Sequence, residues 1–373
     1  MNSAQESNAP FARLHARDLL RRSQTTDNRA IRRIITILAY AYVAALVLVV
    51  IVLRYGSQSL WQADLALYLP RVLFGLPLPI FVVLLLALRS WRALWSQLAA
   101  AIIVMFPLMG LVVPSLPRAP LDPDKAITVF SYNGNFAYGG QDALAQEVRR
   151  FKPDIAVFQQ LVNTDKLDPA LASDYSERRT DGEFFIASKF KIDSAEIPGR
   201  LLYRGAQRSP RFIRYALETS IGPLVVYSVH PISPRYQINA ARSGGLRNAI
   251  MSGALFSLQS RADTESDTGL RTLQVLTFSR MAAREPYPVI VAGDTNLPQL
   301  SPGLSYLDAF RDGFAEVGSG FGYTFPGNQP WMRIDRIFAS RQLEFLKFAV
   351  GQSRASDHLP VFAQLQPTVT PQR

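Results

Sequence analysis

Polar side chains able to hold a metal ion, a phosphate or a proton gather at five places in the C-terminal two thirds of the chain. Four of these places lie at the ends of short apolar segments, and the fifth pairs two segments that are separated in the sequence. They are Ser131–Asn135, Phe158–Leu161, Val229–Pro231, Ala292–Asn296, and Arg333–Asp335 with Ser356–Pro360. Catalytic groups tend to lie where strands give way to loops, so we expect the functional site here.

The histidines narrow the search. The chain has three, of which His15 lies in the N-terminal region, whereas His230 and His358 both fall in these segments. Imidazole exchanges protons near neutral pH, which suits acid–base catalysis. One histidine is more often structural than catalytic, but two at strand ends beside polar turns favour a catalytic interpretation.

Asp294 and Asn296 follow an apolar strand expected over residues 289–292. A carboxylate and an amide two residues apart on a tight turn can hold and align a water molecule, although an ordinary Gly-Asp turn has the same sequence. Asn133 either ligates a cation through its carbonyl oxygen or forms a turn. Oxygen ligands suit magnesium, and the absence of cysteine excludes thiolate ligands, disulfides and a cysteine nucleophile.

Alternating strands and helices are expected to position these groups. β-Forming residues predict strands at residues 127–132, 155–158, 184–187, 224–229, 289–292, 334–338 and 361–364. Leu144, Val148 and Phe151 recur at helical spacing, and a second helix is expected between Tyr236 and Leu258. Residues 126–366 are numerous enough for one α/β domain with a large core.

The order and spacing of these segments resemble the endonuclease/exonuclease/phosphatase superfamily. It includes deoxyribonuclease-type nucleases, abasic-site endonucleases, inositol polyphosphate 5-phosphatases and neutral sphingomyelinases. The motifs ITVFSYN, KPDIAVFQQL, SVHP, VAGDTN, RIDRIF and SDHLPV follow in family order within residues 126–366. The resemblance implies a deoxyribonuclease-I-like α/β fold, a four-layer αββα sandwich, with the site at one end of the two packed sheets.

The resemblance also implies five catalytic residues. Asp294 would orient and activate the attacking water, and Asn296 would position that water or the phosphate. His230 would donate a hydrogen bond to a non-bridging phosphate oxygen. His358 would contact the phosphate or take a proton, held by Asp335, because an Asp–His pair fixes the tautomer and favours the imidazolium. Such donors neutralise the negative charge that grows on the phosphoryl oxygens.

For the metal, the resemblance implies one or two magnesium or manganese ions beside Asn133, Gln160 and Asp357. The family has a glutamate where this chain has Gln160. An amide oxygen brings no negative charge, so the affinity for a hard cation should fall. Three interpretations stay open: a weakened or inactive relative, recruitment of another carboxylate such as Asp165, or a glutamine introduced deliberately.

The first third of the chain is strongly apolar. Uncharged runs cover residues 34–53, 72–88 and 94–113, and about 20 apolar residues span a bilayer core. Buried core helices would also be apolar, but three such runs in so short a stretch disfavour that alternative. We expect a basic cytoplasmic segment at 1–33, three transmembrane helices within 34–113, a proline-rich linker at 114–125, the α/β domain at 126–366 and a tail at 367–373.

Arginines determine the expected orientation. Seven precede the first apolar run, and Arg89 and Arg92 lie between the second and third, so both segments are expected in the cytoplasm. Three spans then place the α/β domain outside the cytoplasm, in the periplasm of a multi-pass inner-membrane protein. If residues 72–88 were re-entrant, the domain would lie on the cytoplasmic side instead.

The candidate site residues and the apolar N-terminal runs together predict a membrane-anchored, divalent-metal-dependent hydrolase of phosphodiester or phosphomonoester bonds. Most of the net charge of +11 belongs to the N-terminal third, which favours lipid headgroups or small phosphodiesters over a nucleic-acid substrate. Arg204, Arg208, Arg211 and Arg214 could line a nucleic-acid groove, but a solvated edge is the preferred interpretation. The alternative function, favoured by Gln160, is a non-catalytic domain that binds phosphorylated ligands or partner proteins.

Overall fold

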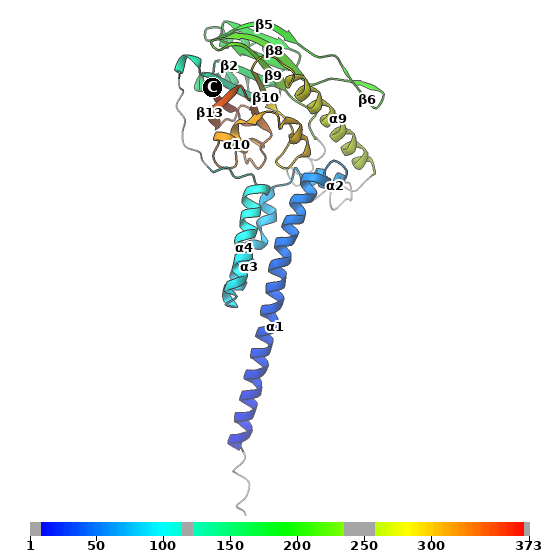
Figure 1. The fold of residues 1–373 in the computed structure, drawn as a ribbon, viewed down its shortest axis with the longest axis vertical. Coiled ribbons are helices and arrows are strands. Elements are labelled where there is room, and N and C mark those ends of the chain that lie inside the picture. The colour runs from blue at the N-terminus through cyan, green and yellow to red at the C-terminus, as the bar shows by residue number, and fades with distance from the viewer. Residues whose placement is uncertain (1–8, 114–121, 235–257, 369–373) are drawn as a thin grey trace, which may run out of the picture. The chain divides into compact units, whose positions relative to one another are not determined.

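Two six-stranded sheets dominate the C-terminal part of the computed structural model, which describes residues 9–113, 122–234 and 258–368 (Figure 1). The first sheet has the order β13-β14-β1-β2-β4-β3. Its strands are β1 Ile127–Asn133, β2 Ile155–Gln159, β3 Glu177–Asp181, β4 Phe184–Ser188, β13 Leu343–Val350 and β14 Val361–Pro367.

The second sheet has the order β11-β12-β10-β9-β8-β5. Its strands are β5 Lys191–Glu196, β8 Phe212–Thr219, β9 Gly222–Val229, β10 Val289–Asp294, β11 Arg311–Asp312 and β12 Asp335–Ala339. Strands β6 Leu201–Tyr203 and β7 Ala206–Arg208 form a separate hairpin. Each sheet thus contains one parallel pair, β1 with β2 and β9 with β10, in otherwise antiparallel surroundings.

The sheets pack face to face because each presents alternate apolar side chains to the other. Val129 and Val157 of the first sheet share one buried cluster with Val226 and Ile290 of the second. The outer face of the first sheet is covered by helices α5 Gln141–Phe151 and α6 Leu167–Leu171. The outer face of the second is covered by helix α9 Leu258–Ala282. The layers therefore run helix, sheet, sheet, helix.

Long apolar helices form a separate compact unit, Met1–Val50 with Arg71–Pro107. Its helices α1 Ala9–Ile51, α3 Pro77–Ala87 and α4 Trp91–Ile103 meet at Ala39, Leu85 and Ala93. Two stretches, Asn28–Gly56 and Trp91–Leu108, are long and apolar enough to cross a membrane, whereas Arg71–Ala87 is shorter. Two of the three expected spans thus meet the criteria of length and composition.

The path of the chain within this unit follows from two hydrogen bonds. Arg32 Nε donates to Ser90 Oγ at 2.9 Å, and the Tyr42 hydroxyl donates to the carbonyl oxygen of Phe74 at 2.7 Å. Helix α3 therefore runs back along α1, from the level of Tyr42 to that of Arg32, and α4 returns after a tight turn.

The segment between the first two apolar runs, Ile51–Pro70, belongs to the same compact unit as the chain from Leu108 onward. The Tyr68 hydroxyl donates to the carbonyl oxygen of Asn296 at 3.2 Å. The Trp331 indole donates to the carbonyl oxygen of Tyr68 at 3.2 Å. The α/β domain was expected from the sequence to begin at residue 126. The sequence did not predict that Ile51–Pro70 would belong to the same unit.

All seven predicted strands and the helix through Leu144 are present in the structure. Seven strands were not predicted: β3, β5, β6, β7, β8, β11 and β13. Of these, β3 and β5 lie at the sheet edges and are half-exposed, which dilutes their apolar pattern. The predicted helix over 236–258, residues 114–121 of the linker and residues 369–373 of the tail lie outside the described residues. The rest of the linker contains a short helical turn, Pro123–Lys125.

Replacing Asp64 by alanine tests whether Ile51–Pro70 stabilises the C-terminal unit. Buried Asp64, in α2 Trp61–Ala66, accepts a hydrogen bond from Thr268 at 2.7 Å and lies 3.7 Å from buried Arg271. Removing one partner of a buried ion pair should cost about 3 kcal/mol of unfolding free energy. Urea unfolding of the full chain in neutral detergent, followed by tryptophan fluorescence, measures this.

Asp193→Ala is the matched control. Its ion pair with Lys191 is largely exposed, so the loss should stay below about 1 kcal/mol. Equal losses in the two variants would contradict the stabilising role of the segment.

Candidate active site

Strands of both sheets end at one common edge. Asn133 is the last residue of β1 and Asp294 the last of β10, and Asn133 Nδ2 donates to Asp294 Oδ2 at 2.9 Å. This hydrogen bond joins the carboxyl ends of the two parallel pairs, β1 with β2 and β9 with β10. Asp335, the first residue of β12, lies opposite Asp294 in the antiparallel pair. The predicted strand ends are therefore neighbours in space.

Backbone geometry at this edge is unusual and specific to the sequence. A Cβ atom at Gly293 would lie 2.0 Å from the carbonyl oxygen of Val229, so only glycine lets β10 approach β9 immediately before Asp294. Gln160 and Asn296 adopt left-handed backbone, with φ of 58° and 51°. Such strained residues cluster at functional sites, where the surrounding structure holds them.

Asp294 lies at the centre of the site. It is 2% exposed, and its Oδ1 accepts a hydrogen bond from the backbone N–H of Asn296 at 2.9 Å. The Nε2 atoms of His230 and His358 lie 3.8 and 3.7 Å from its Oδ2. A buried carboxylate between two imidazoles is positioned to exchange a proton with a molecule in the adjoining cavity.

Asp335 and His358 form the predicted Asp–His pair. His358 Nδ1 lies 2.9 Å from Asp335 Oδ2, and both side chains are buried. Burial alone would lower the pKa of His358, but the nearby carboxylates, led by Asp335, raise it to about 9. The imidazolium form is favoured at neutral pH, with Nδ1–H donating to Asp335. The Phe325 ring, 4.7 Å away between centroids, packs against the imidazole.

His230 is held by two residues that the sequence did not identify as partners. Its Nδ1 lies 3.0 Å from Glu183 Oε2, and Arg211 Nη2 donates to the same oxygen at 2.9 Å. Arg211 Nε also donates to the carbonyl oxygen of His230 at 2.8 Å. Burial would raise the pKa of Glu183, but the hydrogen bonds and charges of His230 and Arg211 hold it below its usual value. The three groups form one hydrogen-bonded cluster.

Arg211 corrects the preferred interpretation of the spaced arginines. It lines the cavity, whereas Arg214 pairs with Glu285 at 2.7 Å on another part of the sheet. Sequence spacing cannot distinguish them, because the difference depends on which carboxylate lies on the neighbouring element. Glu183, in the turn between β3 and β4, has no sequence signal of its own.

A polar cavity of about 260 Å³ adjoins these groups. Seven of the eight predicted site residues line it, and Asp335 lies behind His358. The seven are Asn133, Gln160, His230, Asp294, Asn296, Asp357 and His358. Asp165 does not line it; this residue is exposed and accepts a hydrogen bond from Asn163.

The oxygen atoms that line the cavity are suitable ligands for a hard divalent cation, although few of them carry negative charge. Its two lining carboxylates are Asp294 and Asp357, and its amides include Asn133 and Gln160. Asn133 Oδ1 already accepts the backbone N–H of Asn135 at 3.0 Å. The possible ligand atoms of buried Asp294, Asp335 and His358 also lie within 4.8 Å of one another, and of these groups Asp335 and His358 are hydrogen-bonded.

A two-sheet fold with an Asp–His pair and a second histidine at one edge defines the class of deoxyribonuclease-I-like phosphoesterases. Residues 130–358 match the model of the Endonuclease/Exonuclease/phosphatase family, so the chain belongs to this family. Its members are generally metal-dependent hydrolases of phosphoester bonds. No curated protein matches the chain.

Several solved structures have a similar fold. An endonuclease/exonuclease/phosphatase from Beutenbergia cavernae is 17% identical over 65% of this chain and 72% of that chain, with a TM-score of 0.46. D. rerio TDP2 complexed with a single-strand DNA product is 16% identical over 65% and 99%, with a TM-score of 0.46. Beta toxin from Staphylococcus aureus is 17% identical over 64% and 99%, with a TM-score of 0.43. At such identities the likeness concerns the fold alone.

Changing Arg211 to glutamine tests whether this residue contributes to an anion site. The guanidinium is fixed by Glu183 and lines the cavity, so inorganic phosphate should bind about tenfold more weakly to the variant. Isothermal titration of the full chain in neutral detergent measures the affinity. Arg208→Gln, on exposed strand β7, removes the same charge outside the cavity and should bind phosphate normally. An equal loss in both variants would show that only the net charge matters.

Proposed function

We propose that the chain is a membrane-anchored, divalent-cation-dependent hydrolase of phosphodiester or phosphomonoester bonds. One observation carries the proposal: a buried carboxylate, Asp294, lies between two imidazoles at the edge of a polar cavity. The cavity also contains the Arg211 guanidinium, so one wall can accept a proton while another attracts an anionic phosphate.

Each residue has a distinct task in this proposal. Asp294 accepts a proton from the attacking water, and Asn133 together with the backbone N–H of Asn296 holds the carboxylate in place. The His358 imidazolium donates from Nε2 to a phosphoryl oxygen, while Asp335 fixes its orientation. Arg211 adds a second positive charge, so negative charge developing in the transition state is stabilised by groups that need no rearrangement.

Asp357 and the amide oxygen of Gln160 would hold the cation, magnesium or manganese, as one or two ions. When bound, it would neutralise charge on the phosphoryl oxygens. The Gln160 side chain makes no hydrogen bond to the described residues, so its amide oxygen is available to the cavity. Because the amide is neutral, we expect weak binding of the cation and a requirement for high concentrations of it.

The connectivity supports the membrane anchor and its sidedness. Large apolar side chains of the long helices are exposed, among them Ile37 and Val83, which a bilayer would cover. Ile51–Pro70 and the chain from Leu108 onward belong to one unit, whereas Ser90 bonds to Arg32 at the far end of the helices. Arginine near apolar helices favours the cytoplasmic side of a bilayer, so the proposal assigns the arginine-rich segment to the cytoplasm.

We further propose that the C-terminal unit is periplasmic in a multi-pass inner-membrane protein. A domain tethered beside a bilayer meets lipid headgroups and small periplasmic phosphoesters first, and these are the proposed substrates. A second candidate function, binding of a phosphorylated ligand without hydrolysis, is favoured by Gln160 alone.

Asp294→Asn separates hydrolysis from binding. Hydrolysis of bis(p-nitrophenyl) phosphate by the full chain, with magnesium or manganese present, should fall by about a thousandfold, because the proton acceptor is lost while its shape is kept. Asp165→Asn removes an exposed carboxylate outside the cavity and should retain full activity. Wild-type chain that binds phosphate but hydrolyses nothing would instead support the binding function.

Gln160→Glu tests the cation site. A carboxylate at this position should lower the magnesium concentration needed for half-maximal activity by about tenfold, since hard cations bind largely through carboxylates. Gln207→Glu adds the same charge on exposed strand β7 and should leave the magnesium dependence unchanged. If wild type is already saturated at low magnesium and the Gln160 variant is no better, Gln160 is not a cation ligand.

A further inference from the structure

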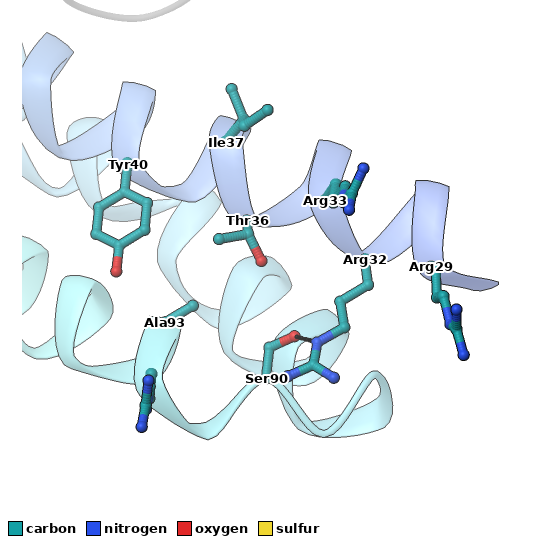
Figure 2. Close-up of a pocket in the computed structure, with 9 residues that line it drawn as sticks. Arg29, Arg32, Arg33, Thr36, Ile37, Tyr40, Ser90 and Ala93 are labelled. Atoms are coloured by element: carbon teal, nitrogen blue, oxygen red, sulfur yellow. Dashed lines mark hydrogen bonds between the residues drawn. The ribbon is translucent and has the colours of Figure 1, made fainter. Parts of the chain in front are cut away.

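A pocket lined by four arginines lies between helices α1 and α4, at the end where Arg32 bonds to Ser90 (Figure 2). Its volume is about 490 Å³. Arg29, Arg32 and Arg33 come from α1, and Arg92 comes from the first turn of α4. This pocket lies outside the candidate active site and has no part in the proposed reaction.

The charges of this pocket are not neutralised within the described residues. None of the four arginines makes an ion pair with a carboxylate in that part of the chain. Arg32 is instead held by buried Ser90, whose hydroxyl accepts its Nε–H at 2.9 Å. This bond occupies one edge of the guanidinium and leaves the Nη groups for another acceptor. Four like charges around one pocket repel one another unless an anion lies among them.

Part of the pocket lining is apolar. Tyr40 and Ala93 lie on the facing sides of the two helices, as Figure 2 shows, and Ile37 also contributes to the lining. The N-terminal end of α4 adds partial positive charge from the aligned peptide dipoles of the helix. The pocket thus pairs a strongly cationic end with an apolar wall, which matches an anionic group carrying an apolar chain.

We propose that this pocket binds the phosphate of an anionic phospholipid headgroup. The proposal rests on the membrane anchoring proposed above, which places these arginines at the cytoplasmic face. Arginine suits the role because its planar guanidinium donates two parallel hydrogen bonds to phosphate oxygens. Basic pockets between membrane helices on the cytoplasmic side are suited to such headgroups. The lipid would tie α1 to the α3–α4 hairpin.

Arg92 and Arg89 provide a matched pair of variants. Both side chains are exposed. Arg89 lies just before α4 and does not line the pocket, whereas Arg92 lies in the first turn of α4 and does. Each glutamine variant loses one positive charge at the same end of the helices, so a general attraction to anionic lipid would weaken equally in both. A specific binding pocket, in contrast, would be weakened by Arg92→Gln and not by Arg89→Gln.

Binding of tail-labelled phosphatidylglycerol to the full chain in neutral detergent, followed by fluorescence anisotropy, measures the effect. Arg92→Gln should weaken binding by about tenfold, Arg32→Gln by at least as much, and Arg89→Gln by less than about twofold. Labelled phosphatidylcholine should bind weakly to every form. Equal binding by wild type and Arg92→Gln, or equal losses in Arg92→Gln and Arg89→Gln, would overturn the proposal.

Competition identifies the source of the phosphate. Unlabelled phosphatidylglycerol should displace the label, and inorganic phosphate should do so only at far higher concentration, because it lacks the apolar chain. Displacement by inorganic phosphate at equal concentration would show a site for the free anion and overturn the lipid assignment. The readout is independent of hydrolysis, so a failure here is distinct from a failure of the proposed activity.

Discussion

Burial of the Asp294 carboxylate is the constraint on which the site depends. Taking a charge out of water costs several kcal/mol unless hydrogen bonds and opposite charges replace the solvent. Here Asn133 supplies a donor from the other sheet, Asn296 supplies a backbone N–H, and two imidazoles lie within 4 Å. Because these groups come from both sheets, the sheets must pack in one relative position. The close approach of β10 to β9 at Gly293 is part of the same arrangement.

Two basic side chains, Arg211 and His358, line the cavity and are held in place by neighbouring carboxylates. His358 takes its positive charge from its carboxylate neighbours, and Arg211 keeps its orientation through Glu183. In the proposed function, the positive charges of His358 and Arg211 would supply part of the neutralisation of a bound anion that, in the family, comes from a cation held by the glutamate. Under the proposed function, a neutral Gln160 would weaken the binding of the cation more than that of the anion.

The connection between two apolar helices, Ile51–Pro70, is part of the C-terminal unit. Its Tyr68 hydroxyl donates a hydrogen bond to the carbonyl oxygen of Asn296, which lines the candidate active-site cavity. Within the separate helical unit, Arg92 of α4 and the arginines of α1 line one pocket.

The sequence by itself predicted many of the local elements and most residues that line the candidate site. Apolar alternation identified the strands, uncharged runs identified the long helices, and polar residues at strand ends identified His230, Asp294 and His358. Only the tertiary structure decided that Arg211 and Glu183 support His230 and that residues 51–70 join the C-terminal unit. The physical reason is that the spacing of buried residues can be seen within one segment of the sequence. The partner of a charged side chain, in contrast, depends on how distant segments pack.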